Sequence, residues 1–99
     1  MPNVAWAPNS RRDLLRLAAF LLPRNPDAAR RAVLTIRERV KLLEAQPAIG
    51  RPVAGMSVEY REWMVPFGGN SYVVFYYYDG RAVTVLSVRH GRERGYVSP

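Results

Sequence analysis

The residues best suited to chemistry lie together near the end of the chain. The chain has a single histidine, His90, and a tyrosine, Tyr96, lies six residues after it. Three arginines lie close to these two residues: Arg89, Arg92 and Arg94. Histidine and tyrosine side chains can exchange protons with a substrate, and arginine binds phosphate or carboxylate groups. The segment therefore predicts a cationic surface that either binds an anionic partner or acts on one.

One reaction needs only these residue types. Cleavage of RNA by its own 2′-hydroxyl requires a base, an acid for the leaving 5′-oxygen, and cations that stabilise the phosphate. Arg61 would add a further cation, and nearby aromatic side chains could stack on unpaired bases. The alternative without catalysis is a basic segment that binds phosphate or a carboxylate-rich peptide. The spacing of Asp and Glu is not typical of a metal site, so we expect no metal and no other cofactor.

Composition limits the kinds of protein this can be. The 99 residues predict one domain over residues 1–99, and the net charge of +7 predicts a nucleic acid or an acidic protein as partner. All basic residues except Lys41 are arginine, and there is no cysteine. The beginning of the chain lacks the pattern of a signal peptide, and no apolar run reaches the roughly 20 residues of a membrane span. We therefore expect a cytoplasmic protein without a membrane partner.

Local signals predict the elements that position these residues. A short strand at 4–6 precedes a helix that begins at Pro8 and ends before Pro23. Asn25 is a good N-cap for a second helix, which begins at Pro26 and continues to Gln46. Strands are predicted at 58–65, 72–78 and 82–88, with a loop at 49–55, a turn at 66–70 and a hairpin turn at Asp79-Gly80.

The predicted fold class is α+β. A short N-terminal strand and an antiparallel helical hairpin pack on one face of a mainly antiparallel sheet of three to four strands. Residues 72–78 are apolar or aromatic at every position, so both faces of this strand carry such side chains. We infer that a partner covers part of the second face; the alternative is that loops and the first strand cover it. His90 is expected in a glycine-containing turn just after the last strand.

The chain resembles the RelE/ParE superfamily of toxins from bacterial type II toxin–antitoxin systems. The matching features span nearly the whole sequence: Trp6-Ala7-Pro8, Asp13-Leu14, Asn25-Pro26 with Ala29, Leu43 with Pro47, Gly50-Arg51, Tyr60-Arg61-Glu62, Tyr72 with Tyr76, and Val88-Arg89-His90-Gly91-Arg92. The resemblance implies the fold class given above. It also implies a cognate antitoxin that wraps the toxin in a heteromeric complex. Its expected contacts are aromatic residues of the sheet: Trp63, Tyr72, Tyr76 and Tyr78.

Two branches of the superfamily imply different activities. RelE-like members cleave mRNA in the ribosomal A site, and that branch would assign catalytic roles to His90, Arg92, Tyr96 and Arg61. However, Val73 stands where the branch has a catalytic arginine, and Trp63 replaces a second basic residue.

ParE-like members inhibit DNA gyrase without the nuclease residues. The Gly50-Arg51 and Arg61-Glu62 pairs and the Arg-His-Gly-Arg run favour this branch. Its target contacts would come from arginines, namely Arg51, Arg81, Arg89 and Arg94. The hypotheses are therefore a gyrase inhibitor, a ribosome-dependent endoribonuclease, or a non-toxic basic module that only binds its acidic partner.

Overall fold

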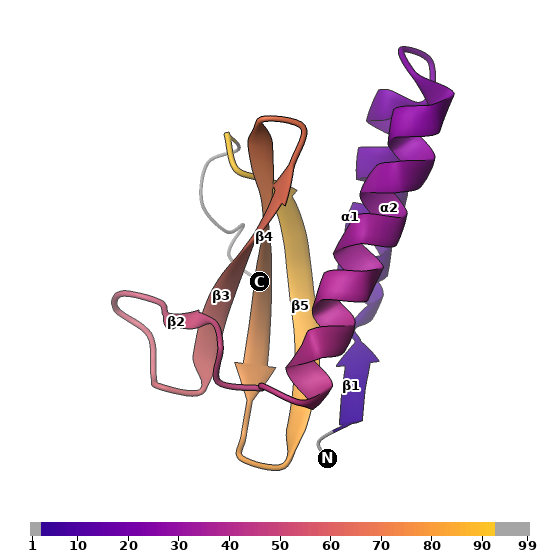
Figure 1. The fold of residues 1–99 in the computed structure, drawn as a ribbon. Helices are drawn as coiled ribbons and strands as arrows, with labels where there is room; N and C mark the ends of the chain where they lie inside the picture. Colours follow the sequence, from indigo (N-terminus) through magenta and orange to yellow (C-terminus); the bar gives the residue numbers. More distant parts are fainter. Residues whose placement is uncertain (1–2, 93–99) are drawn as a thin grey trace.

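A five-stranded sheet forms one layer of the structure and a pair of helices forms the other (Figure 1). The computed structural model describes residues 3–92. The elements in chain order are β1 (Asn3–Trp6), α1 (Pro8–Leu21), α2 (Pro26–Lys41), the 3₁₀ turn η1 (Leu42–Glu44), β2 (Arg51–Pro52), β3 (Tyr60–Phe67), β4 (Asn70–Tyr78) and β5 (Ala82–His90).

The strand order is β1-β5-β4-β3-β2, in which β1 runs parallel to β5 and the other neighbours are antiparallel. The predicted α+β class with a helical hairpin on one face is confirmed. The fifth strand is β2, which lies within the predicted loop at 49–55 and pairs two residues with β3. Within residues 3–92, neither helix is long and apolar enough to cross a membrane.

The helices begin where the sequence places their start signals. Pro8 opens α1, and the Asn25 side chain accepts a hydrogen bond from the Ala28 N–H at 3.0 Å at the start of α2. The predicted end of the second helix at Gln46 was wrong, because the regular helix ends at Lys41. The chain then tightens into η1, whose Leu43 is still fully buried.

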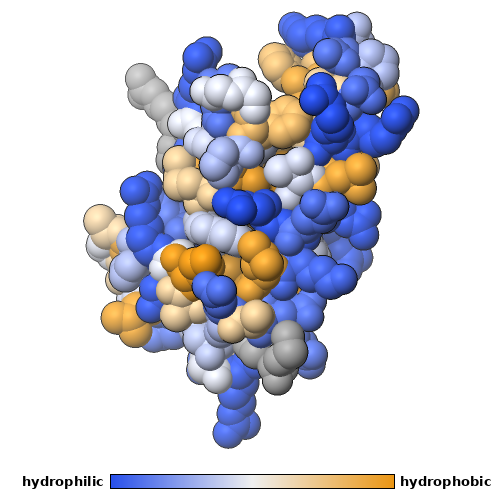
Figure 2. All heavy atoms as spheres, in the orientation of Figure 1, coloured by the Kyte–Doolittle hydropathy of each residue, from blue (hydrophilic) through white to orange (hydrophobic). Residues whose placement is uncertain are grey.

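The core lies between the helices and the facing side of the sheet. Apolar residues of α1, α2 and η1 meet side chains from β3, β4 and β5. The members with the least exposure are Ile36, Val40, Leu43, Val65, Val74, Tyr76, Val83, Val85 and Val88. Figure 2 shows the opposite pattern on the outside, where hydrophilic residues cover most of the helical hairpin with smaller apolar groups between them. Each helix is therefore amphipathic and buries one face on the sheet.

The β3–β4 hairpin is longer than predicted. Gly68 and Gly69, both with positive φ, form its two-residue turn, so Pro66 belongs to β3. The predicted start at Val58 was wrong, because residues 53–59 form turns before the strand begins at Tyr60. At the other end of the sheet, Asp79 closes the β4–β5 turn by accepting the N–H groups of Arg81 and Ala82 at 2.8 Å.

A β-bulge interrupts β5 near its middle. Tyr76 pairs with Val85, but the preceding residue Phe75 pairs with Ser87, so Leu86 is an extra residue in β5. The extra residue shifts the alternation of side chains, because each residue of a strand normally faces the opposite side from the last. Val88 therefore joins Val85 in the core, and His90 faces the helices as well.

Candidate functional site

His90 is the last residue of β5, not a residue of the following turn, which corrects the sequence prediction. It pairs with Tyr72 of β4, and the two rings meet edge to face with centroids 5.6 Å apart. The His90 Nδ1 accepts a hydrogen bond from the backbone N–H of Arg92 at 3.1 Å. A neutral ring with Nδ1 as acceptor carries its proton on Nε2, which makes Nε2 a hydrogen-bond donor.

His90 and Arg92 lie between two hollows. The α1 hollow, of about 720 Å³, is bounded by the end of α1, the β3–β4 turn and the end of β5, and its walls are Arg16, Leu17, Phe20, Leu21, Phe67, Gly68, Asn70, Tyr72, His90 and Arg92. The turn hollow, of about 400 Å³, is formed by Met64, Gly69, Asn70, Ser71, His90, Gly91 and Arg92. The α1 hollow thus combines an apolar floor with two arginines and a histidine, which suits a ligand with apolar and anionic parts.

A carboxylate joins α1 to the strand that carries His90. Asp13 accepts the backbone N–H of Val88 through Oδ2 at 2.9 Å, and its Oδ1 lies 3.8 Å from Nη2 of Arg16. The Asp13 side chain is only 18% exposed. Nothing in the local sequence indicates that β5 packs beside this turn of α1, so this contact of Asp13 is seen only in the structure.

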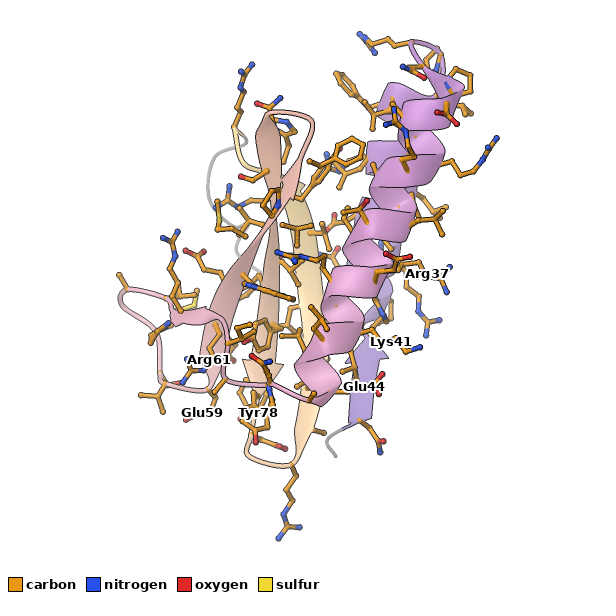
Figure 3. All side chains as sticks on the ribbon, viewed as in Figure 1. Arg37, Lys41, Glu44, Glu59, Arg61 and Tyr78 are labelled. Carbon is orange, nitrogen blue, oxygen red and sulfur yellow. The ribbon has the colours of Figure 1, made fainter. Side chains whose placement is uncertain are left out.

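Arg61, labelled in Figure 3, lies near the start of β3, whereas His90 ends β5 at the opposite end of the sheet. Arg61 pairs with Tyr76, whereas His90 pairs with Tyr72. These two partners are four residues apart in β4, which is about 13 Å along the strand. Arg61 Nη1 donates to the carbonyl oxygens of Gly50 at 2.7 Å and Ala48 at 3.3 Å. The expectation that Arg61 lies beside His90 was therefore wrong, and its guanidinium holds the segment before β2.

The other predicted cationic residues do not gather around His90. Arg51 of β2 forms an ion pair with Glu62 of β3, with Nη2 and Oε1 2.7 Å apart. Arg81 lies in the exposed β4–β5 turn at the far end of the sheet. Arg89 pairs with Val73, so it projects from the face opposite His90. Of the predicted functional residues, Arg94 and Tyr96 lie outside the described part of the chain.

The aromatic residues predicted to bind an antitoxin face the helices. Tyr72 and Tyr76 are 4% and 0% exposed in the core, so the structure corrects their assignment to a contact surface. Trp63 and Tyr78 are partly buried beside that core, and the Arg39 guanidinium lies 5.1 Å from the centre of a Trp63 ring. The opposite face carries Tyr60, Phe75 and Tyr77, of which Tyr60 contacts the other two rings.

Sequence reasoning missed several residues of the site because their signals are not local. Arg16 and Phe20 of α1 line the α1 hollow, although no local signal in the sequence marks either one as a site residue. Asn70 and Ser71 line the turn hollow from a strand predicted to begin at Tyr72. Within residues 3–92, no group of three histidine or acidic side chains is placed to hold a metal ion.

A family model described as "ParE toxin of type II toxin-antitoxin system, parDE" matches residues 4–95. Two proteins from Caulobacter vibrioides are similar in sequence. "Toxin RelE3" is 38% identical over 94 residues, which cover 95% of this chain and 99% of that protein. "Toxin RelE1" is 34% identical over 85 residues, which cover 86% of this chain and 88% of that protein.

Solved structures share the fold. A chain of the chromosomal ParDE toxin–antitoxin system from P. aeruginosa aligns with a TM-score of 0.75 at 22% identity, over 91% of this chain and 96% of that one. A chain of the Staphylococcus aureus YoeB dimer aligns with a TM-score of 0.60 at 16% identity, over 96% and 98% of the two chains. At these identities the likeness concerns the arrangement of helices and strands.

Proposed function

We propose that this chain, which belongs to the ParE toxin family of type II toxin–antitoxin systems, inhibits DNA gyrase by binding it, without cleaving RNA. Its activity as a toxin would be neutralised by a cognate antitoxin in a heteromeric complex in the cytoplasm. The working surface would be the end of β5, where His90 and Arg92 lie with Arg16 around the α1 hollow.

The observation that carries this proposal is the separation of Arg61 from His90. An endoribonuclease that uses the 2′-hydroxyl of its RNA substrate needs cations, a general acid and a general base around one phosphate. Arg61 instead donates to the carbonyl oxygens of Gly50 and Ala48 at the opposite end of the sheet. Val73, which stands where the RelE-like branch has a catalytic arginine, is only 2% exposed. These positions support a surface that binds a protein.

The His90 ring also favours binding over base catalysis. Its Nδ1 accepts the Arg92 N–H, which leaves Nε2 protonated in the neutral ring. A protonated nitrogen donates a hydrogen bond to a carboxylate, whereas a general base needs a nitrogen with a lone pair. Together with Arg92 and Arg16, this donor would bind acidic groups of the target beside the apolar floor of the α1 hollow.

The test is a supercoiling assay with purified gyrase and purified toxin. Wild-type protein at micromolar concentration should reduce supercoiling or trap cleavage complexes, and His90→Ala and Arg92→Ala should each weaken the effect at least about tenfold, the loss of one or two charge-assisted contacts. Arg30→Ala is the matched control, because Arg30 is an exposed arginine of α2 whose side chain is 72% accessible. Full gyrase activity with wild-type toxin would reject the proposal.

A ribosome-dependent endoribonuclease is the second candidate. It is favoured by the names of the two similar Caulobacter vibrioides toxins, and by the aromatic rings of Tyr72 and Phe67 beside His90. It predicts codon-positioned cuts in mRNA on translating ribosomes, which primer extension would reveal. If neither assay responds and expression leaves growth unchanged, the chain is the third candidate, a non-toxic module that binds an acidic partner.

Of the four aromatic residues predicted to contact the antitoxin, two are accessible in the structure and two are not. Trp63 and Tyr78 keep partly exposed surface, whereas Tyr72 and Tyr76 are buried. We propose that Tyr60 and Tyr77, on the sheet face away from the helices, take part in antitoxin binding in their place. Alanine substitution of either residue should weaken antitoxin binding in titration calorimetry without changing toxicity in the absence of antitoxin.

A further inference from the structure

The outer edge of β5 has two different neighbours along its length. Over residues 82–85 it pairs with β1, and the last bond of this part runs from the Ala7 N–H to the Val85 carbonyl oxygen at 2.9 Å. After β1 the chain turns into α1. Beyond Val85, β5 therefore no longer has β1 beside it, and α1 packs against β5 instead. The register of the second half of β5 is therefore not set by pairing with β1.

The bulge at Leu86 lies at this change of neighbour, and it decides which face His90 occupies. In a regular strand His90 would face the side opposite Val83 and Val85, because it is an odd number of residues away from them. With one extra residue, Val88 and His90 both face the helices. A one-residue slip would move His90 to the other face of the sheet.

Asp13 forms a direct bond to the strand just after the bulge. Its Oδ2 accepts the N–H of Val88 at 2.9 Å, and Val88 is fully buried. Its Oδ1 lies 3.8 Å from Arg16, which lines the α1 hollow with His90 and Arg92. The same carboxylate thus contacts both elements that supply cations to the hollow.

We infer that Asp13 is a positioning residue, which selects the bulged register of β5 and so places His90 and Arg92 opposite Arg16 at the α1 hollow. Only this register brings the Val88 N–H to the part-buried Asp13 carboxylate while the Val88 side chain stays in the core. A strand slipped by one residue would offer Asp13 a neighbouring N–H only by turning Val88 out of the core. The inference rests on the proposed function in one respect: the effect on toxicity assumes that the working surface is the end of β5 that carries His90.

The experiment compares three variants of the full chain. Asp13→Ala removes the acceptor, Asp13→Asn keeps an oxygen that can accept the Val88 N–H, and Asp27→Ala removes an exposed carboxylate of α2 as a control for net charge. Val83→Ala, in the core of the β1-paired half of β5, is a control for loss of stability. Each protein is released from its antitoxin complex and refolded before measurement.

The first readout is spectroscopic and does not depend on the target. In wild type and Asp13→Asn, the Val88 amide should be protected from hydrogen exchange, and NMR should show the His90 ring near Tyr72 with Nδ1 as an acceptor. In Asp13→Ala, Val88 protection should fall at least about tenfold and the His90–Tyr72 contact should weaken, while residues 82–85 remain protected. Unchanged Val88 and His90 signals in Asp13→Ala would overturn the inference.

The second readout is growth inhibition on controlled expression, scored at equal levels of folded protein. Asp13→Ala should lose at least about tenfold in potency, more than Val83→Ala, whereas Asp13→Asn and Asp27→Ala should remain within about threefold of wild type. Equal losses in Asp13→Asn and Asp13→Ala would reject the role of the acceptor. If wild type does not inhibit growth, the proposed function fails, while the spectroscopic readout still decides the role of Asp13.

Discussion

The Tyr76 hydroxyl oxygen lies 2.8 Å from the Gly50 nitrogen, across 26 residues of sequence. The hydroxyl accepts the Gly50 N–H and donates to the Pro47 carbonyl oxygen, also at 2.8 Å. Because Arg61 donates to the Gly50 carbonyl oxygen, both polar groups of this glycine are bound by side chains of the sheet. These bonds fasten the segment between η1 and β2 to the centre of the sheet.

Tyr76→Phe should destabilise the protein without disturbing His90. The substitution keeps the ring but leaves a buried N–H and a carbonyl oxygen without their partner, which costs about 1–3 kcal/mol of unfolding free energy. Urea unfolding followed by circular dichroism would measure the loss. A midpoint equal to that of wild type would show that water replaces the hydroxyl.

Gly50→Ala should be at least as damaging, for a steric reason. A Cβ at this position would lie 2.6 Å from the Tyr76 hydroxyl oxygen and 2.8 Å from the Glu62 carbonyl oxygen, so the backbone would have to move. Overpacking of this kind costs about 1–3 kcal/mol. Ala54→Ser, in an exposed part of the following loop, is the control and should unfold like wild type. Equal stability of the two variants would contradict this account.

Arg61→Ala should lower the stability of the protein and leave its toxicity per folded molecule unchanged. Loss of its bonds to Gly50 and Ala48 should lower the unfolding free energy by about 1–2 kcal/mol, since these are hydrogen bonds from a charged donor. Growth inhibition per folded molecule should stay close to wild type. Arg92→Ala should show the reverse, with stability within about 0.5 kcal/mol of wild type and activity reduced, because Arg92 is exposed beside His90.

The contrast between these two variants separates a structural arginine from a functional one. Protein concentration in the soluble fraction and the urea midpoint measure the effect on stability. Potency at equal concentration of folded protein measures the effect on function. A folded Arg61→Ala protein without toxicity would instead place Arg61 in the working surface, as the RelE-like assignment implies.

Stability should decline in alkaline solution through the buried tyrosines. Burial raises the pKa of Tyr72, and burial also raises that of Tyr76 although the Gly50 N–H and the Arg61 charge oppose it. A folded-state pKa above the unfolded value of 10.0 means that the stabilisation is complete below pH 10.0 and is lost as pH rises through the folded pKa. Urea midpoints measured from about pH 8 to pH 11 would follow this loss.

Tyr72→Phe provides the comparison for the alkaline effect. The substitution removes one of the two tyrosines whose pKa is raised by burial. The stability of the variant should therefore depend less steeply on pH above 10.0 than the stability of wild type. Identical slopes for the two proteins would show that Tyr72 ionises as readily in the folded state as in the unfolded state.

Sequence reasoning predicted the features whose causes lie within a few residues. Asn25 and Pro26 mark the start of α2 through capping and a fixed φ, and both features are seen. Asp79-Gly80 marks the β4–β5 turn because the Asp79 carboxylate binds amides two and three residues ahead. The helix stripes and the β-branched and aromatic strands gave the α+β class, since these periodic patterns decide which face of each element is buried.

Features that depend on the register between distant segments needed the tertiary structure. β2 is too short to leave a periodic pattern, and it forms a strand only because β3 pairs with it. Arg61 and His90 both belong to the predicted site and to the sheet region of the sequence, yet the β3–β4 and β4–β5 registers place them at opposite ends of the sheet.

The sequence by itself determined the order of the elements, the excess of arginine and the presence of His90 close to the end of the last strand. Only the tertiary structure decided which way His90 faces. Simple alternation from Val83 and Val85 would send its ring away from the helices, and the bulge at Leu86 reverses this. The bulge is followed by a bond between Val88 and Asp13, residues 75 positions apart, which come together only when α1 packs on β5.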